Sequence, residues 1–356
     1  MDPISHVAWG IVATNLLPEP DAMLPRIVIA SVAAAAPDFD FVTKFFKNIY
    51  FLKYHHSVTH SLVGVSVMGL AIAFLGRLAF PEIAFGEAYL VALVAGVSHC
   101  VLDLIMHGTG AMVLWPFSRR MITASLLLGL NPTTTHARCH EKSLRVCLVC
   151  QLHSAMMCPM TWLGLLAAAA SVFAGSFRQI VALAGAVLGV SYMLMCYLMK
   201  KKSRRVASRI VPEATKVLAF PAGFSPFQWL VVCQTSLGFR LLWLHSRDSR
   251  PRATRAIPPV ASSAAIDRSR STKTVREFLS ACVIPWVFQT KDGDTVRVQW
   301  QDLSYALSSS MDLYAARITM RRDLSVIDED FRERWPDLWQ PGYLMGEDAV
   351  EGREAS

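Results

Sequence analysis

Histidine and aspartate residues gather in the first third of the chain, in or beside strongly apolar stretches. An ionisable side chain in an apolar segment is energetically expensive, so each one is a candidate for function. Imidazole and carboxylate ligands together suit zinc, manganese, iron or nickel, whereas magnesium and calcium prefer shells of oxygen atoms alone. The four clusters are His6, Asp38 with Asp40, His55 with His56 and His60, and His99 with Asp103.

Spacing brings some of these residues to one face of a helix. His99 and Asp103 are four residues apart, and so are His56 and His60. Residues at this spacing point to the same side of a helix, one turn from each other. An isolated His–Asp pair more often forms a hydrogen bond between helices, and a lone histidine such as His6 is more often a structural residue. Because several such clusters occur together in this part of the chain, a metal site is favoured over these structural roles.

Hydrolysis is the reaction that such a site suits. With one of His55 and His56 counted, the four histidines and three aspartates exceed the needs of one tetrahedral ion, so two ions, or one ion with outer carboxylates, both fit. A bound metal lowers the pKa of water to roughly 7, which makes it a usable nucleophile. Asp38 or Asp40 can then act as the base, although an aspartate in this position can also serve only as a helix cap.

The composition indicates a membrane protein, since 53% of the 356 residues are hydrophobic, 17% are charged and the mean hydropathy is +0.36. Three segments are long and apolar enough to cross a bilayer, and a fourth is longer and carries Pro159, which predicts a kinked or tilted crossing. Two shorter apolar segments predict buried or re-entrant helices. The predicted crossings are residues 61–80, 88–106, 144–174 and 180–199, and the shorter segments are 27–36 and 121–130.

The distribution of basic residues predicts on which side of the membrane each loop lies. Lysine and arginine gather before the first predicted crossing, between the second and third, and after the fourth, with few in the other two loops. The positive-inside rule then predicts four crossings with both termini in the cytoplasm. All the histidine and aspartate clusters fall on this same face, which is an agreement between two independent patterns.

The fold class that follows is a membrane all-α protein, a polytopic helical bundle, with a small C-terminal β-rich cytoplasmic domain. Residues 1–205 form the membrane-embedded domain and residues 206–245 short strands. Residues 246–276 read as a basic flexible linker attracted to anionic lipid. Residues 277–356 form a β-containing region, in which Lys291-Asp292-Gly293-Asp294 marks the turn of a hairpin.

Other partners and sites are less well supported. Nucleic-acid binding is not favoured, because no aromatic pattern or known module accompanies the basic linker. A rival structural zinc site could use His136, His140, Cys147 and Cys150, but its spacing is not that of a common zinc finger. The eight cysteines show no paired framework, so free thiols are expected.

Several stretches resemble the YdjM-like family of bacterial inner-membrane proteins, assigned as metal-dependent hydrolases and in some cases described as LexA-regulated. The matching stretches are Ser5-His6 with Gly10, Pro37-Asp38-Phe39-Asp40, His55-His56-Ser57-Val58-Thr59-His60-Ser61-Leu62, Ser98-His99-Cys100-Val101-Leu102-Asp103 and Leu114-Trp115-Pro116-Phe117. The resemblance implies a multi-pass protein of the inner membrane.

Carried over by position, the resemblance implies metal ligands at His6, Asp38, Asp40, His55, His60, His99 and Asp103. Zinc is the expected ion, with manganese or iron as alternatives. The chain departs from the family where the family often has Arg-Gly, since His56-Ser57 stands there. The chain therefore lacks the arginine that could bind a phosphate or carboxylate group. His56 could replace His55 as a ligand.

Two classes of function are therefore open. The first is a membrane-bound metal-dependent hydrolase, acting on a phosphoester or another small-molecule or lipid-like substrate that arrives from the membrane interface. The second is a metal-stabilised scaffold or an ion- or proton-handling transporter. A transporter needs polar residues that continue through the bilayer to its far side. Residues 64–74 and 89–97 are nearly all apolar, which favours a site on one side of the membrane.

Overall fold

The computed structural model describes residues 2–19, 22–45, 56–107, 110–128, 158–223, 225–259, 262–306 and 315–332. These residues separate into two compact units. The first contains the described residues up to Lys202 together with residues 220–228, and the second contains the other described residues from Ser203 onward.

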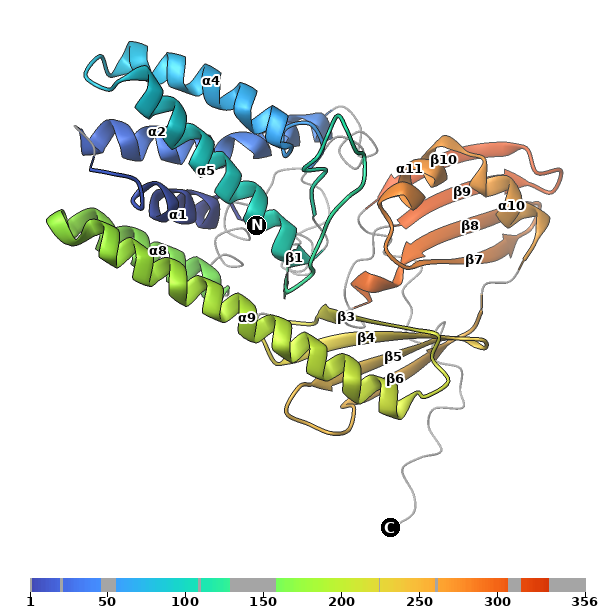
Figure 1. Ribbon diagram of the computed structural model, residues 1–356. Helices are drawn as coiled ribbons and strands as arrows, with labels where there is room; N and C mark the ends of the chain where they lie inside the picture. The colour runs from blue at the N-terminus through green and yellow to red at the C-terminus, as the bar shows by residue number, and fades with distance from the viewer. Residues whose placement is uncertain are drawn as a thin grey trace. The chain divides into compact units, whose positions relative to one another are not determined.

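The first unit is a bundle of helices (Figure 1). Helix α1 packs against α2, α5 and α8, and α5 also packs against α2 and α4. Small residues such as Ala30, Ala34, Ala92 and Ala95 are fully buried between these helices, which lets the backbones approach closely. The elements are α1 (Pro3–Thr14), α2 (Met23–Ala35), η1 (Ala36–Phe45), α4 (Leu62–Ala79), α5 (Phe85–Ile105), α8 (Pro159–Phe173), η3 (Gly175–Phe177) and the part of α9 (Arg178–Ile210) up to Lys202.

Three helical segments are long and apolar enough to cross a membrane: Leu62–Ala79, Phe85–Ile105 and Gly175–Ile210. They correspond to three of the four predicted crossings. The remaining apolar helix, α8, has 15 residues. Pro159 does not kink a longer helix as predicted but occupies the first helical position, where a missing N–H costs no hydrogen bond. Residues 144–157 lie outside the described residues.

The two shorter apolar segments behave differently. Residues 27–36 fall in α2, whose inner face is buried, as predicted. Residues 121–128 are not helical, so the prediction of a helix over 121–130 is wrong for the part that the structure describes. Their backbone pairs with the end of α5 instead: Ala124 N–H donates to Leu104 O at 2.6 Å, and strand β2 (Leu127–Leu128) pairs with β1 (Met106–His107).

Close packing of α1 on α2 depends on Gly10. A Cβ at this position would lie 2.6 Å from Ala34 Cβ, closer than real side chains approach. We therefore expect Gly10→Ala to lower the free energy of unfolding by about 1–3 kcal/mol, measured by unfolding in detergent. Gly86 in α5 provides the control, because among the described residues nothing lies within 4 Å of its added Cβ. Equal effects of both substitutions would contradict this packing.

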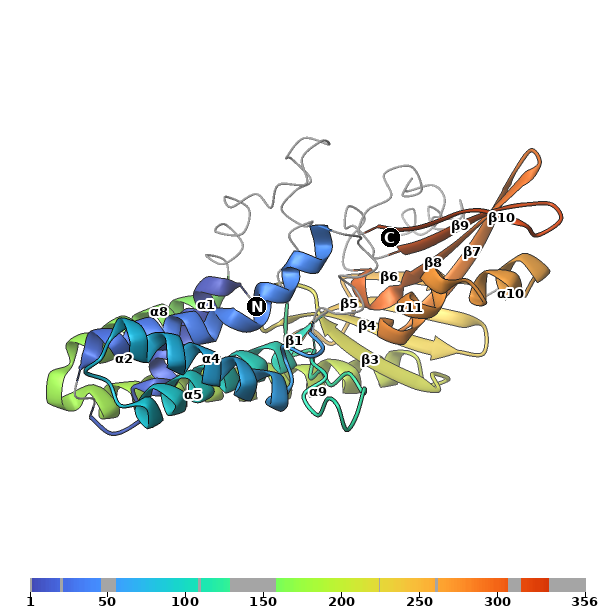
Figure 2. The ribbon, with the colours of Figure 1, turned by 90° about the horizontal axis from the view of Figure 1, so that it is seen from above.

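The C-terminal part of the chain forms two four-stranded sheets, as the β-rich pattern predicted (Figure 2). In the hairpin predicted around Gly293, β7 pairs antiparallel with β8, and Gly293 has a φ of 56°. The sheets have the orders β3-β4-β5-β6 and β10-β9-β8-β7. The strands are β3 (Lys216–Pro221), β4 (Gln228–Thr235), β5 (Gly238–His245), β6 (Ala253–Ile257), β7 (Pro285–Asp292), β8 (Thr295–Asp302), β9 (Ala315–Arg321) and β10 (Val326–Arg332), and a short 3-10 turn η4 (Leu303–Tyr305) follows β8.

The segment interpreted as a flexible linker, residues 246–276, contains more regular structure than its composition suggested. It holds β6, helix α10 (Ala264–Arg270) and the start of helix α11 (Lys273–Ala281). Ser263 and Thr272 cap the two helices, and Ile266 and Val275 are buried at 1% and 0% exposure. Capping and a few well-placed apolar residues thus outweighed a polar average composition.

Candidate metal centre

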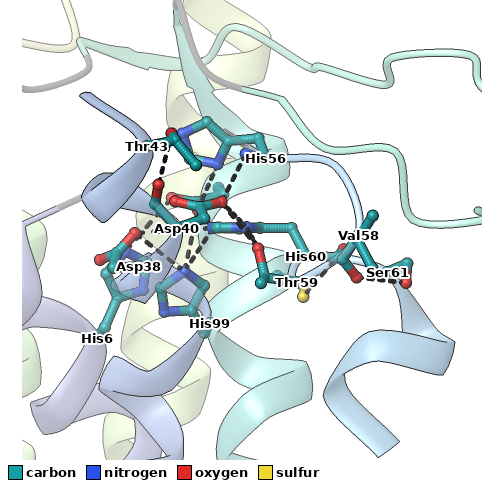
Figure 3. A network of polar contacts seen from close by, with 12 residues as sticks. His6, Asp38, Asp40, Thr43, His56, Val58, Thr59, His60, Ser61 and His99 are labelled. Atoms are coloured by element: carbon teal, nitrogen blue, oxygen red, sulfur yellow. Dashed lines mark hydrogen bonds and ion pairs between the residues drawn. The ribbon is translucent and has the colours of Figure 1, made fainter. Parts of the chain in front are cut away.

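The ends of several elements of the helical bundle meet at the histidine and aspartate residues (Figure 3). His6 lies on α1, Asp38 and Asp40 on η1 just after α2, and His99 with Asp103 on the last turns of α5. His60 lies in the turn that leads into α4. The next residue, Ser61, caps α4 by accepting a hydrogen bond from Gly64 N–H at 2.9 Å, which fixes where this turn ends.

Four of the predicted ligands bring one atom each into a single cluster, which we call the His/Asp cluster. The ligand atoms of Asp38, His60, His99 and Asp103 all lie within 4.8 Å of one another. His60 Nε2 is 3.1 Å from His99 Nε2 and 3.3 Å from Asp103 Oδ2. His99 Nε2 is 3.2 Å from the same oxygen. Asp38 Oδ1 is 3.7 Å from His60 Nε2 and 3.6 Å from His99 Nε2.

These separations match the size of a tetrahedral metal site. Zinc bonds to nitrogen and oxygen at about 2.0–2.2 Å, which gives about 3.4 Å between the ligand atoms of a tetrahedron. The five separations above run from 3.1 to 3.7 Å. His60, His99 and Asp103 have no exposed side-chain surface, whereas the Asp38 side chain is 24% exposed. The cluster is therefore closed on three sides and accessible beside Asp38.

Hydrogen bonds on the far side of each ring orient the two imidazoles. His99 Nδ1 lies 2.6 Å from the backbone carbonyl of Ala34, an acceptor that only an N–H can satisfy. His60 Nδ1 lies 3.2 Å from Asp40 Oδ2. With both protons on Nδ1, the two Nε2 lone pairs face each other at 3.1 Å. Such an arrangement needs a cation or an additional proton between the rings, so these residues fit a metal.

Asp40 supports the cluster instead of joining it. Its Oδ2 accepts hydrogen bonds from His56 N–H at 3.0 Å and from the Thr59 hydroxyl at 2.8 Å, besides facing His60. A carboxylate that orients a metal-binding imidazole in this way is a common feature of metal sites. The structure thus places Asp40 behind His60, and not among the four cluster atoms where it was predicted.

We expect Asp40→Asn to weaken metal binding by about 10–100-fold while leaving the four cluster residues in place. The amide would no longer stabilise the Nδ1–H form of His60 as a carboxylate does. Titration of metal-free protein with zinc measures the change. Asp267→Asn is a suitable control, since Asp267 is a 67% exposed aspartate on α10. Unchanged affinity in Asp40→Asn would argue against a supporting role.

His6 and His56 flank the cluster through Asp103. His6 Nε2 is 3.3 Å from Asp103 Oδ1, and the His6 ring stacks on His99 with centroids 3.6 Å apart. His56 Nδ1 is 3.3 Å from Asp103 Oδ2. His56 adopts a φ of 61°, which is rare for a residue other than glycine, and its backbone bonds Asp40 and Met112.

Burial and neighbouring charge set the ionisation of the histidines outside the helical spans. Burial first, and then the charge of His99, lower the pKa of His6 to about 4, so this ring is neutral at physiological pH. Burial also disfavours a charged His60, but the carboxylates of Asp103, Asp38 and Asp40 beside its ring together raise its pKa well above the usual range. The position between the rings therefore favours positive charge, whether it comes from a proton or from a metal.

His55 and the rival zinc site at His136, His140, Cys147 and Cys150 lie outside the described residues. All the cysteines that the structure describes are free: Cys100, Cys158, Cys196, Cys233 and Cys282. His60, a predicted ligand, belongs to the cluster. His56, which the departure from the family's Arg-Gly pattern marked as a possible replacement for His55, reaches Asp103 Oδ2 at 3.3 Å.

The helical part of the chain matches a known family. A sequence profile of the family described as YdjM inner membrane protein matches residues 1–201. A protein of Bacillus subtilis (strain 168), described as uncharacterized protein YfhP, is 24% identical over 246 residues, which cover 67% of this chain and 67% of that protein. No solved structure matches the chain.

Proposed function

Because the chain belongs to the YdjM inner membrane protein family, we propose that it is a membrane-bound, metal-dependent hydrolase whose active site is the His/Asp cluster. The observation that carries the proposal is the pair of Nε2 atoms of His60 and His99, 3.1 Å apart, with Asp38 Oδ1 and Asp103 Oδ2 each within 3.7 Å of both. Two oriented imidazoles and two carboxylates form a mixed donor set that zinc prefers, with manganese or iron as alternatives.

Asp38, His60, His99 and Asp103 would hold the ion. When bound, it supplies Lewis acidity, which lowers the pKa of a water molecule to roughly 7 and so provides a nucleophile at neutral pH. Asp40 keeps His60 in the tautomer that presents Nε2, and the Ala34 carbonyl does the same for His99. Asp38 is the partly exposed member, so its carboxylate can receive the proton of an incoming water.

Substrate would approach beside Asp38 from the membrane interface. Phe39 and Val42, on the same 3-10 segment, are 73% and 54% exposed. The cluster lies where α4 begins at Leu62 and α5 ends at Ile105, and the ends of spanning helices lie near the headgroup region. An exposed apolar rim beside a cationic centre suits a phosphoester or other lipid-related substrate. We place this end of the bundle, and both termini, on the cytoplasmic side of the membrane.

One observation favours a second candidate, a metal-stabilised scaffold without enzymatic activity. Three of the four cluster side chains are completely buried, which is typical of structural metal sites with no open coordination position. The two candidates predict different behaviour when metal is added. A catalytic ion beside the partly exposed Asp38 exchanges with the added metal, whereas a structural ion in a closed site does not.

The first experiment is elemental analysis of the full chain purified in detergent. We expect at least one zinc, manganese or iron ion per wild-type chain, exchangeable with added metal, and loss of this ion in His60→Ala. His245→Ala is the matched control, since His245 lies in β5 of the C-terminal sheet. The loaded wild type is then assayed on soluble and lipid phosphoesters. A folded wild type that binds no metal after reconstitution would overturn the proposal, and a bound ion without turnover on any phosphoester would favour the scaffold.

A further inference from the structure

Four imidazole rings surround the Asp103 carboxylate, and they are divided between its two oxygens. Three ring nitrogens, from His56, His60 and His99, lie 3.2–3.3 Å from Oδ2. His6 Nε2 alone among these lies at Oδ1, at 3.3 Å. The carboxylate of Asp103 therefore presents one oxygen to the His/Asp cluster and the other to a histidine outside it.

The two ring nitrogens of His6 have no hydrogen-bond partner among the described residues. The side chain is nevertheless completely buried. The 3.3 Å between His6 Nε2 and Asp103 Oδ1 is longer than the 2.7–3.2 Å of an ordinary N–H···O hydrogen bond, so this contact falls short of one. A buried polar group without a partner costs free energy, so the position calls for a missing partner.

The fold nevertheless holds the His6 ring firmly in place. It stacks on His99 at an interplanar angle of 18°. The neighbouring Ser5 hydroxyl bonds the Asp2 carboxylate and lies 2.6 Å from the Thr161 hydroxyl on α8, which anchors the start of α1. The 3.3 Å between His6 Nε2 and Asp103 Oδ1 is close to the separation of about 3.4 Å expected between two ligand atoms of one tetrahedral ion.

We infer that Asp103 bridges two metal ions, one in the His/Asp cluster on Oδ2 and a second on Oδ1 that His6 Nε2 also binds. The inference rests on the proposed function for its first ion and adds a second. A bridging carboxylate holds two ions roughly 3.5–4 Å apart, the separation at which a pair can clamp the attacking and leaving oxygens of a phosphoester. With only His6 and Asp103 as protein ligands, the second ion keeps open positions for water or substrate.

The test counts zinc in the full chain loaded with zinc alone and washed of excess metal. We expect two ions per wild-type chain and one in His6→Gln, which keeps the size of the side chain. Because Cys147 and Cys150 could hold a zinc of their own, Cys147→Ser/Cys150→Ser is measured in parallel and is expected to keep both ions. Loss of the second ion in the cysteine variant, or its retention in His6→Gln, would overturn the inference.

A measurement on the wild type tests the same inference without relying on the folding of His6→Gln. Manganese-loaded protein is expected to give the exchange-coupled electron paramagnetic resonance spectrum of an ion pair, whereas isolated ions give six-line spectra. A wild type with one ion and an uncoupled spectrum would overturn the bridged pair and leave the proposed hydrolase intact. A wild type that binds no ion would overturn the proposed function itself, so the two failures are distinguishable.

Discussion

Asp103→Asn is expected to lower the metal affinity of the chain by more than about 100-fold, since losing even a supporting partner of a metal ligand costs about 10–100-fold. The substitution keeps the shape of the side chain but removes the negative charge that faces four imidazole rings. Asp38 is then the one carboxylate left among the four cluster residues, so the ion loses half of the negative charge that these residues supply. Any metal-dependent turnover is expected to disappear with the metal.

The measurement is a zinc titration of metal-free protein, followed by elemental analysis. Asp40→Asn provides an internal scale, because Asp40 orients His60 but lies outside the four cluster atoms. Its effect is therefore expected to be smaller than that of Asp103→Asn. Equal effects would mean that Asp103 also acts only as a support. An unchanged affinity in Asp103→Asn would remove it from the ligand set.

Trp9→Ala is expected to lower the free energy of unfolding by about 3–5 kcal/mol, the usual cost of deleting a buried aromatic side chain. The Trp9 ring lies against two glycines of the neighbouring helices: a Cβ on Gly164 would lie 2.7 Å from it, and a Cβ on Gly189 2.4 Å. The indole N–H donates to Met160 O at 3.0 Å. Removing the ring therefore leaves a cavity shaped by α1, α8 and α9.

Unfolding of the detergent-solubilised chain measures this loss. Trp162 lies on α8 and is 46% exposed, so Trp162→Ala is the control for deleting an indole and is expected to cost much less. Because Trp9 and His6 lie on the same short helix, Trp9→Ala is also expected to weaken metal binding. A loss below about 1 kcal/mol would show that the site collapses around the deleted ring.

The sequence by itself was sufficient to locate the longest elements. Residues 61–80 and 88–106 differ from α4 (Leu62–Ala79) and α5 (Phe85–Ile105) by at most a few residues at each end. A continuous apolar run must form helix in a bilayer because its backbone has no water to bond. The hairpin around Gly293 was predictable for a similarly local reason, since its turn needs a positive φ.

Local patterns failed where the outcome depended on distant contacts. Residues 121–128 are apolar enough for a helix, but their backbone is paired with the end of α5. Likewise, the composition of residues 246–276 is that of a linker, yet caps at Ser263 and Thr272 and buried Ile266 and Val275 organise part of it.

The chemistry of the candidate site divides in the same way. Residue types and the four-residue spacing of His99 and Asp103 were enough to predict imidazole and carboxylate ligands on one face, because the covalent chain fixes separations within a helix. Only the tertiary structure decided that Asp38 faces the cluster while Asp40 lies behind His60, and that His6 meets the second oxygen of Asp103. These relations join α1, η1, the turn before α4 and α5, and side-chain packing between elements far apart in sequence sets them.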